Sequence, residues 1–390
     1  MKITLIGTAY PFRGGLASFN ERLMEEFSKE GNSTEINTFT LQYPAIFFPG
    51  KTQYANSDNN SKIQIYRNIN SINPFNWLKV GKKLKCSKPD IIIIKYWMSF
   101  FAPCFGTIAR IAKKNNKTKI IVILDNVIPH EPRFFDKVFT KYFVRGADAF
   151  IAMSNKVLND LKTFDNKKPK ILTPHPLFDN FGEKIEKQQA VNFLHNQYES
   201  IPTEKQMIRL LFFGLIRAYK GLDLLIEALA RKDLQTFPLH LVVAGEFYED
   251  SKPYFEKVKK LGLEQRITFI NKFIDDIYVK NYFCSSDLLV LPYKDATQSG
   301  VTQIAYHFDL PMIVTDVGGL AEIVPDGVSG YVCKKANKDC LADTILKYCT
   351  EKPDFTHTLA CEKSKYSWNI MTKKIKELYY NIETNKKNCN

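Results

Sequence analysis

The feature that most constrains the fold is a series of short apolar runs, each followed by an amphipathic segment of helical length. Two of the runs, Ile91–Ile94 and Ile120–Ile123, consist only of isoleucine and valine. Continuous β-branched runs of this kind are typical of strands that are buried on both faces of a parallel sheet. The alternation of such runs with helical patterns therefore predicts an α/β protein with parallel sheets.

The alternation occurs in two series. The first predicts strands at Lys2–Gly7, Thr34–Phe39, Ile63–Tyr66, Asp90–Lys95, Lys119–Leu124, Asp148–Met153 and Lys170–Leu172. The second predicts strands at Ile208–Phe213, Leu239–Ala244, Arg266–Ile270, Asp287–Pro292 and Met312–Thr315. A chain of 390 residues is too long for one ordinary core. We therefore expect two doubly wound domains, residues 1–180 and 207–366, with a linker at 181–206 and a cleft at the strand ends.

The positive charge is concentrated in the first half of the chain. Residues 1–190 contain 29 Lys/Arg against 16 Asp/Glu, whereas the remaining residues contain 26 against 25. Such a surface attracts nucleic acid, phospholipid headgroups or a phosphorylated acceptor, and of these we expect an anionic membrane surface as a partner of the basic N-terminal domain. One candidate patch is Lys82, Lys83, Lys85 and Lys88, and another is Lys113, Lys114, Lys117 and Lys119. Solvated lysines of an ordinary basic protein are the alternative.

Other classes of protein are disfavoured by the sequence. No apolar run reaches the roughly 18–20 residues that cross a bilayer, and the N-terminus lacks a signal-peptide pattern. We expect a cytoplasmic protein that is peripheral at the inner membrane face. The eight cysteines form no CxxC pair and no zinc-like spacing with histidine, so no metal site is expected.

The first candidate site lies in the loop after the first strand. Gly14 and Gly15 open directly into a helix. Glycine lets the backbone approach a ligand closely, and a helix N-terminus offers free N–H groups to an anion. A tight strand-to-helix turn is the alternative.

The second candidate site follows the strand that ends at Gly214. Arg217 and Lys220 stand in the loop before a helix that is expected to begin near Gly221. Two cations beside a helix N-terminus, at the carboxyl end of a central strand, suit a diphosphate group. A pair of surface cations is the alternative.

The third candidate site follows the strand that ends at Pro292. Backbone amides of Gly300 and Val301, with the Thr297 and Ser299 hydroxyls, are placed to bind phosphate oxygens. After the next strand, Glu322 stands in the first turn of a short helix. It can cap that helix or accept a hydrogen bond from a hydroxyl-rich ligand.

Taken together, these segments resemble family 4 of the retaining glycosyltransferases, which share the GT-B fold. The resemblance also includes the strand end VVAGE at Glu246, the block TDVGGLAEIV and the terminal helix with YSWNIM, so it runs from Lys2 to about Tyr380. It implies two Rossmann-like domains with a C-terminal helix, about 367–382, that crosses back to the first domain. It also implies a nucleotide-diphosphate sugar held by the C-terminal domain and an acceptor held by the N-terminal domain. No metal and no cofactor are expected, because the basic pair neutralises the leaving diphosphate.

The sequence departs from the family where two glutamates eight positions apart are usual. Without gaps, these positions fall on Ala296 and Ile304, whereas Asp295 and Gln303 keep the spacing one step earlier. The chain resembles a branch in which an ATQSG loop replaces the first glutamate. Aligning Asp295 and Gln303 with the family glutamates requires a local shift, so the contacts to the donor sugar and the ribose stay open, and Gln303 is a candidate for binding the nucleotide sugar.

His130 is a candidate for contact with the donor sugar. It follows the strand Lys119–Leu124 in the segment LDNVIPHEPRF. In the family, a histidine near this point contacts the donor sugar, although an equally common position aligns with Asp125. A solvated loop histidine is the alternative.

The predicted function is a retaining glycosyltransferase that moves a sugar to a glycan or lipid-linked acceptor, in cell-surface polysaccharide biosynthesis. Arg217 and Lys220 are the expected catalytic residues, with His130. A GT-B nucleotide-sugar epimerase and a non-catalytic nucleotide-sugar-binding protein are the alternatives. Nucleic-acid binding is not expected, because no recognisable module accompanies the charge.

Overall fold

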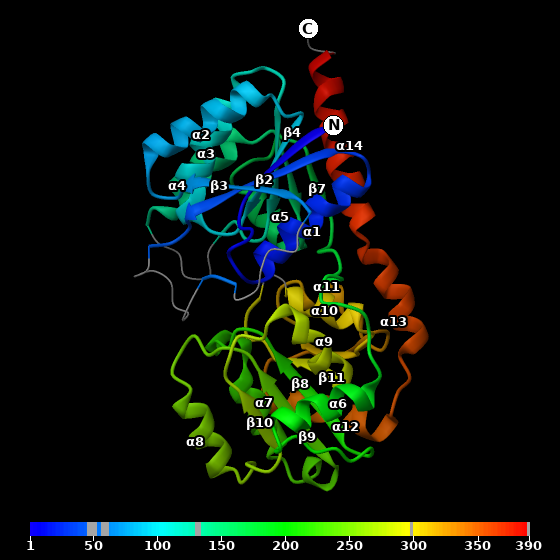
Figure 1. Cartoon of the computed structure of the whole chain (residues 1–390). Coiled ribbons are helices and arrows are strands. Elements are labelled where there is room, and N and C mark those ends of the chain that lie inside the picture. The colour runs from blue at the N-terminus through cyan, green and yellow to red at the C-terminus, as the bar shows by residue number, and fades with distance from the viewer. Residues whose placement is uncertain (45–52, 56–61, 129–133, 297–298, 388–390) are drawn as a thin grey trace. The chain divides into compact units, whose positions relative to one another are not determined.

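The computed structural model describes residues 1–44, 53–55, 62–128, 134–296 and 299–387. The chain divides into two compact units (Figure 1). The first unit comprises Met1–Pro176 together with Ser367–Asn390, and the second comprises Leu177–Tyr366.

The first unit is built on a seven-stranded sheet with the order β3-β2-β1-β4-β5-β6-β7. All neighbouring strands are parallel. The strands are β1 (Lys2–Ile6), β2 (Ser33–Leu41), β3 (Gln64–Asn70), β4 (Ile91–Tyr96), β5 (Lys119–Leu124), β6 (Ala149–Ala152) and β7 (Lys170–Leu172). The helices are α1 (Gly15–Lys29), α2 (Pro74–Ser87), α3 (Ala102–Lys113), α4 (Asp136–Gly146), α5 (Asn155–Lys162) and α14 (Trp368–Lys387).

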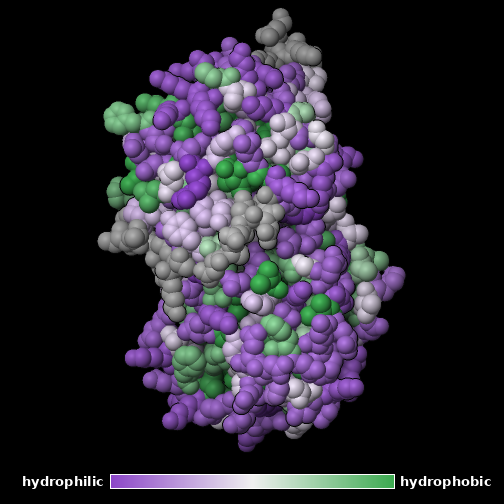
Figure 2. Space-filling view, viewed as in Figure 1, coloured by the Kyte–Doolittle hydropathy of each residue, from purple (hydrophilic) through white to green (hydrophobic). Residues whose placement is uncertain are grey.

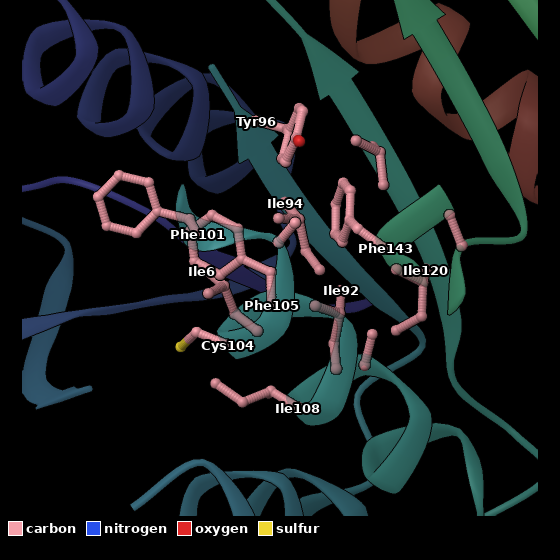
Figure 3. Packing of buried hydrophobic residues seen from close by; sticks show 14 of the residues in the cluster. Ile6, Ile92, Ile94, Tyr96, Phe101, Cys104, Phe105, Ile108, Ile120 and Phe143 are labelled. Carbon is pink, nitrogen blue, oxygen red and sulfur yellow. The ribbon is translucent and has the colours of Figure 1, made fainter. Parts of the chain in front are cut away.

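One face of this sheet is covered by α2, α3, α4 and α5. Apolar side chains of β4 and β5, such as Ile92 and Ile120, pack there against Phe105 of α3 and Phe143 of α4 (Figure 3). The β-branched runs form central strands because both of their faces are covered by helices, so no polar alternation is needed.

The opposite face of the sheet is covered by α1 and α14. Helix α14 contacts α1, β5, β6 and β7. Its buried side chains recur at helical spacing along one stripe: Trp368, Met371, Ile375 and Leu378. The C-terminal helix thus completes the first unit although it follows the whole second unit in the chain.

The second unit is built on a six-stranded parallel sheet with the order β10-β9-β8-β11-β12-β13. Its strands are β8 (Ile208–Phe213), β9 (Leu239–Ala244), β10 (Ile267–Ile270), β11 (Leu288–Leu291), β12 (Met312–Thr315) and β13 (Gly330–Cys333). Its helices are α6 (Lys187–Gln197), α7 (Leu222–Leu229), α8 (Lys252–Lys260), α9 (Asp276–Ser285), α10 (Gly300–His307), α11 (Leu320–Ile323), α12 (Lys338–Glu351) and α13 (Thr356–Lys363). The predicted α/β fold with two Rossmann-like units is confirmed.

Residues 181–206, which the sequence analysis treats as a linker, lie within the second unit. Helix α6 packs against α9 and buries Ala190, Val191 and Leu194. Its apolar positions are confined to Ala190–Leu194 and are flanked by polar residues on both sides, so the sequence pattern of a packed helix is short there.

Candidate functional site

Glycines hold the carboxyl ends of β8 and β9 close together in the second unit. Gly245, after β9, has φ of +154°, and a Cβ there would lie 1.9 Å from the Gly214 carbonyl oxygen. Gly214, after β8, itself has φ of +100°. Glycine therefore fits both positions where a side chain would not, and the two loops leave the sheet side by side.

The loop after β8 is held against the end of β11 by Gly221. This residue has φ of +70°, and a Cβ there would lie 1.9 Å from the carbonyl oxygen of Pro292. The short 3₁₀ turn Ala218–Lys220 precedes Gly221, and α7 begins at Leu222. The close approach fixes where the Lys220 side chain can lie.

Lys220 is the central cation of this site. Its side chain is buried, with 8% of the residue exposed. A Cβ at Gly214 would lie 3.3 Å from the Lys220 Nζ, and the same Nζ lies 5.5 Å from the ring centroid of Tyr293. The ammonium group therefore lies at the edge of the sheet, between the ends of β8 and β11.

The electrostatic surroundings of Lys220 favour an anionic ligand. Burial lowers the pKa of Lys220 to about 8; Tyr219 opposes this shift and Arg217 adds to it. Within the described residues, neither Lys220 nor Arg217 forms an ion pair with a carboxylate. The neighbouring Lys294, by contrast, pairs with Asp223 at 2.7 Å. Two cations that no carboxylate of the described residues neutralises suit a diphosphate group.

Arg217 lies on the exposed side of the same loop. Its guanidinium carbon lies 5.2 Å from the ring centroid of Tyr248, in the loop after β9. The two loops are joined through their backbones, because Ile216 donates to the Glu246 carbonyl and Tyr248 donates to the Ile216 carbonyl. Arg217 thus lies three residues before Lys220, on a loop that backbone hydrogen bonds hold against the loop after β9.

The N-terminus of α10 adjoins the same point. Val301 lies in the first turn of this helix, and its Cγ2 would be 3.6 Å from a Cβ at Gly214. Ser299, immediately before α10, is buried, and its Oγ lies 3.2 Å from the Tyr293 hydroxyl oxygen. The structure therefore brings Gly214, Lys220 and Val301 together, with Ser299 near by through Tyr293.

The remaining residues predicted around α10 have different surroundings. A Cβ at Gly300 would lie 2.7 Å from Cε2 of Phe178, so any larger residue there would force the Phe178 ring to move. Gln303 is fully buried, and neither polar atom of its amide has a hydrogen-bond partner among the described residues. Thr297 lies outside the described residues.

The candidate residues Glu246 and Glu322 follow two other strands at the same edge of the sheet. Glu246 is buried in the loop after β9. Glu322 is exposed on α11, a helix of four residues. The turn before α11 contains Gly318, which has φ of +56°. Both carboxylates thus follow strands of the sheet that carries Lys220.

In the first unit, Gly14 and Gly15 form the start of α1. Gly14 has φ of +101°, and a Cβ there would meet nothing within 4 Å. The backbone conformation, and not a close neighbour, is what favours glycine at this position. His130 lies outside the described residues.

A buried ion pair in the first unit was missed by the sequence analysis. Lys95, at the end of β4, pairs with Asp125, which follows β5, at 2.9 Å. The Lys95 Nζ also lies 3.5 Å from the ring centroid of Phe19 on α1. Burial lowers the pKa of Lys95, and Asp125 opposes that shift. The sequence feature that points to this ion pair is the single lysine in the apolar run IIIIKY.

His175 lies beside this ion pair. Its ring centroid lies 5.0 Å from that of Phe19, and its Nδ1 lies 2.7 Å from the carbonyl oxygen of Pro176. Burial lowers the pKa of His175 to about 3, and the Lys95 charge adds to the effect. The imidazole is therefore neutral at physiological pH.

No group of three or more His, Cys, Asp or Glu side chains that could hold a metal ion occurs in the described part of the chain. The cations and amides at the ends of β8 and β11 are the groups available for an anionic ligand.

Comparisons with known proteins concern the family and the fold of the chain. Residues 208–351 match the family model described as glycosyl transferases group 1. An uncharacterized glycosyltransferase of Methanocaldococcus jannaschii is 24% identical over 389 residues, covering 97% of this chain and 98% of its own.

Two solved structures show the same fold over nearly the whole chain. Sucrose-phosphate synthase from Thermosynechococcus elongatus superposes with a TM-score of 0.73 at 17% identity, covering 98% of this chain and 99% of its own. The Anabaena protein HepE, solved in complex with UDP, superposes with a TM-score of 0.72 at 16% identity. The match covers 98% of this chain and 100% of HepE. The chain thus has the GT-B fold, and residues 208–351 of its second unit match the model of the group 1 glycosyl transferases.

Proposed function

We propose that this protein is a retaining glycosyltransferase that moves a sugar from a nucleotide-diphosphate sugar to a hydroxyl of a glycan or lipid-linked acceptor. Cell-surface polysaccharide biosynthesis is the process in which we place it. The observation that carries the proposal is Lys220 at the sheet edge of the unit that matches the group 1 glycosyl transferases, because it is buried and pairs with no carboxylate of the described residues. A neighbour of the same fold was solved with UDP, which makes UDP-sugars the first donors to test.

The proposed chemistry follows from the groups around Gly214. The bond between the anomeric carbon and the diphosphate oxygen breaks, and the acceptor oxygen forms a new bond to that carbon. Lys220 and Arg217 stabilise the negative charge that develops on the departing diphosphate, and the first amides of α10 add hydrogen-bond donors. The acceptor proton passes to a leaving-group oxygen, so atoms and charges balance.

Gln303 supports the binding of a polar donor in the same place. An amide buried without a partner costs roughly 1–3 kcal/mol, and a ligand hydroxyl or carbonyl that reached it would remove this cost. In this proposal, Gln303 takes the role that the second family glutamate has toward the ribose.

The test is a transfer assay after a thermal-shift panel of UDP-, GDP- and other nucleotide sugars. A ligand that binds the native state raises the melting temperature. With the donor so identified, Lys220→Ala and Arg217→Ala should each lower turnover by about 10²-fold, as expected when a preorganised cation is removed from a leaving group. Lys259→Ala, at an exposed lysine near the end of α8, is the control and should keep activity.

The outcomes distinguish the proposal from its rivals. Near-normal turnover in both site variants would contradict the roles given to Arg217 and Lys220. Conversion of the donor sugar to its epimer, without an acceptor, would indicate a nucleotide-sugar epimerase. Donor binding without any turnover against lipid-linked or glycan acceptor extracts would indicate a binding protein.

A further inference from the structure

The positive charge of the chain belongs to one structural unit. The first unit contains 32 Lys/Arg against 15 Asp/Glu, a net charge of +17, whereas the second contains 23 against 26, a net charge of −3. The difference is larger than the two halves of the sequence show, because α14 adds its lysines to the first unit.

Not all of these lysines are available to a partner. Of the patch Lys113, Lys114, Lys117 and Lys119, three members form ion pairs. Lys113 pairs with Asp148, Lys117 pairs with Asp90, and Lys119 pairs with Glu383. Lys119 is also buried. The expectation that this patch is a free basic surface is therefore wrong.

Helix α2 is different, because it contains no acidic residue. The side of α2 that is buried carries Val80 and Leu84. Its exposed side carries Phe75, Leu78, Lys79, Lys82, Lys83 and Lys85. Phe75 is 83% exposed. A bulky apolar side chain thus stands at the start of a row of lysines.

Helix α4 repeats this arrangement. Its exposed side chains, with that of the residue two positions before it, are Phe134, Lys137, Val138, Lys141, Tyr142 and Arg145. Phe134 is 95% exposed and Val138 is 67% exposed. The acidic residue of α4, Asp136, is buried and accepts a hydrogen bond from Ser99.

The two helices flank α3 in one layer, since α3 contacts both α2 and α4. We name the exposed side chains of α2 and α4 given above the α2–α4 surface. None of its cations pairs with a carboxylate in the described part of the chain. Figure 2 shows hydrophobic residues among hydrophilic ones along the edge of the first unit where Figure 1 places these helices.

We infer that the α2–α4 surface docks on an anionic lipid bilayer. Lysine and arginine attract the headgroups, and each contributes about 1 kcal/mol near such a surface. The exposed Phe75, Phe134 and Val138 enter the boundary between headgroups and acyl chains, as the apolar side chains of interfacial helices do. A polyanion such as nucleic acid would use the cations but would leave these apolar side chains in water.

This attachment uses no membrane-spanning segment. Over the residues that the structure describes, no helix combines the length and apolar character that a membrane span requires. The attachment is therefore reversible and depends on salt, because the Debye length falls from about 10 Å at 0.1 M to about 3 Å at 1 M.

The experiment is co-sedimentation of the full chain with phosphatidylglycerol vesicles and with phosphatidylcholine vesicles, at low and high salt. No nucleotide sugar is present, so the outcome does not depend on the proposed transfer reaction. We expect binding to phosphatidylglycerol at low salt, loss of that binding at high salt, and little binding to phosphatidylcholine.

Matched variants separate the charges from the apolar contacts. Lys79→Gln, Lys82→Gln and Lys85→Gln together should weaken binding about 100-fold, since three cations at about 1 kcal/mol each are removed. Lys252→Gln, Lys259→Gln and Lys260→Gln remove the same charge from α8 of the second unit and should leave binding unchanged. Phe75→Ser with Phe134→Ser should weaken binding tenfold or more, whereas Ile277→Ser with Phe255→Ser, exposed positions in the second unit, should not.

Three results would overturn the inference. The first is equal binding to both lipids, or none to phosphatidylglycerol at low salt. The second is an equal loss in the α2 and α8 charge variants, which would show an effect of net charge alone. The third is unchanged binding in the Phe75/Phe134 variant, which would show that charge alone attracts the vesicles and that these side chains do not enter the bilayer.

Discussion

At the scale of single residues, burial sets the chemistry of Lys220. An exposed lysine keeps its proton to about pH 10, whereas burial, with Arg217 adding to it, brings the pKa of Lys220 to about 8. A diphosphate group bound beside Lys220 would favour the charged form and raise this pKa again. Ligand affinity should then fall as the pH rises through about 8, because the unliganded lysine loses its proton there.

This linkage gives a direct prediction. At pH 9, binding of the nucleoside diphosphate that stabilises the chain most should take up close to one proton, whereas at pH 6.5 the Lys220 contribution should vanish. Calorimetry in two buffers with different ionisation enthalpies measures the uptake. The Lys220→Arg variant keeps the positive charge but does not titrate between pH 6.5 and 9. The proton uptake that accompanies ligand binding at pH 9 should therefore be lost in this variant. The same uptake in that variant would assign the proton to another group.

At the scale of elements, α14 shows how a distant segment can complete a sheet. The helix follows the second unit in the chain, yet its buried stripe covers β5, β6 and β7 of the first unit. Polar contacts add to this packing: Lys119 of β5 pairs with Glu383 at 2.6 Å, and Lys376 pairs with Glu30 at 2.5 Å. The first unit therefore depends on α14 for part of its packing.

Two isoleucines on α14 test this dependence. Ile375 is fully buried against the sheet, so Ile375→Ala should lower the free energy of unfolding by about 2–5 kcal/mol through a lost contact and a cavity. Ile370, on the same helix, is 37% exposed, and Ile370→Ala should cost about 1 kcal/mol or less. Chemical denaturation measures both changes. Similar losses in the two variants would show that helix propensity, and not burial, is responsible.

At the scale of the whole molecule, charge is divided between the two units. The first unit has a net charge of +17 and the second a net charge of −3, yet the second unit carries Arg217 and Lys220 at its sheet edge, where no described carboxylate pairs with them. A local arrangement of charges, rather than net charge, therefore makes this edge suitable for a diphosphate.

We predict that transfer needs no added divalent metal. In the proposed reaction, Arg217, Lys220 and the first amides of α10 already neutralise the leaving group. Activity should therefore persist in EDTA at the level seen with Mg²⁺ or Mn²⁺, measured by nucleotide release with an acceptor present. Loss of activity in EDTA that either metal restores would contradict the proposed roles of these groups.

Most strands could be predicted from the sequence because central parallel strands are continuous apolar runs. The ranges of β5, β7, β8, β9 and β12 agree with their predicted bounds. The edge strand β13 was not predicted, because Gly330–Cys333 is short and offers only one β-branched residue. Helix α6 was not predicted as part of a packed unit, because its burial depends on α9, which lies far away in the sequence.

For the candidate site, the sequence by itself determined the residue types and their order. Glycines at strand ends and the pair Arg217 and Lys220 before a helix could be identified from local patterns alone. Only the tertiary structure decided that Lys220 is buried, that Gly214 and Val301 adjoin it, and that the amide of Gln303 has no described partner. The structure also shows that Lys95 pairs with Asp125, and it shows which lysines of the basic patches form ion pairs with described carboxylates. The physical reason is that burial and charge pairing depend on distances between residues far apart in the chain, which local periodicity does not encode.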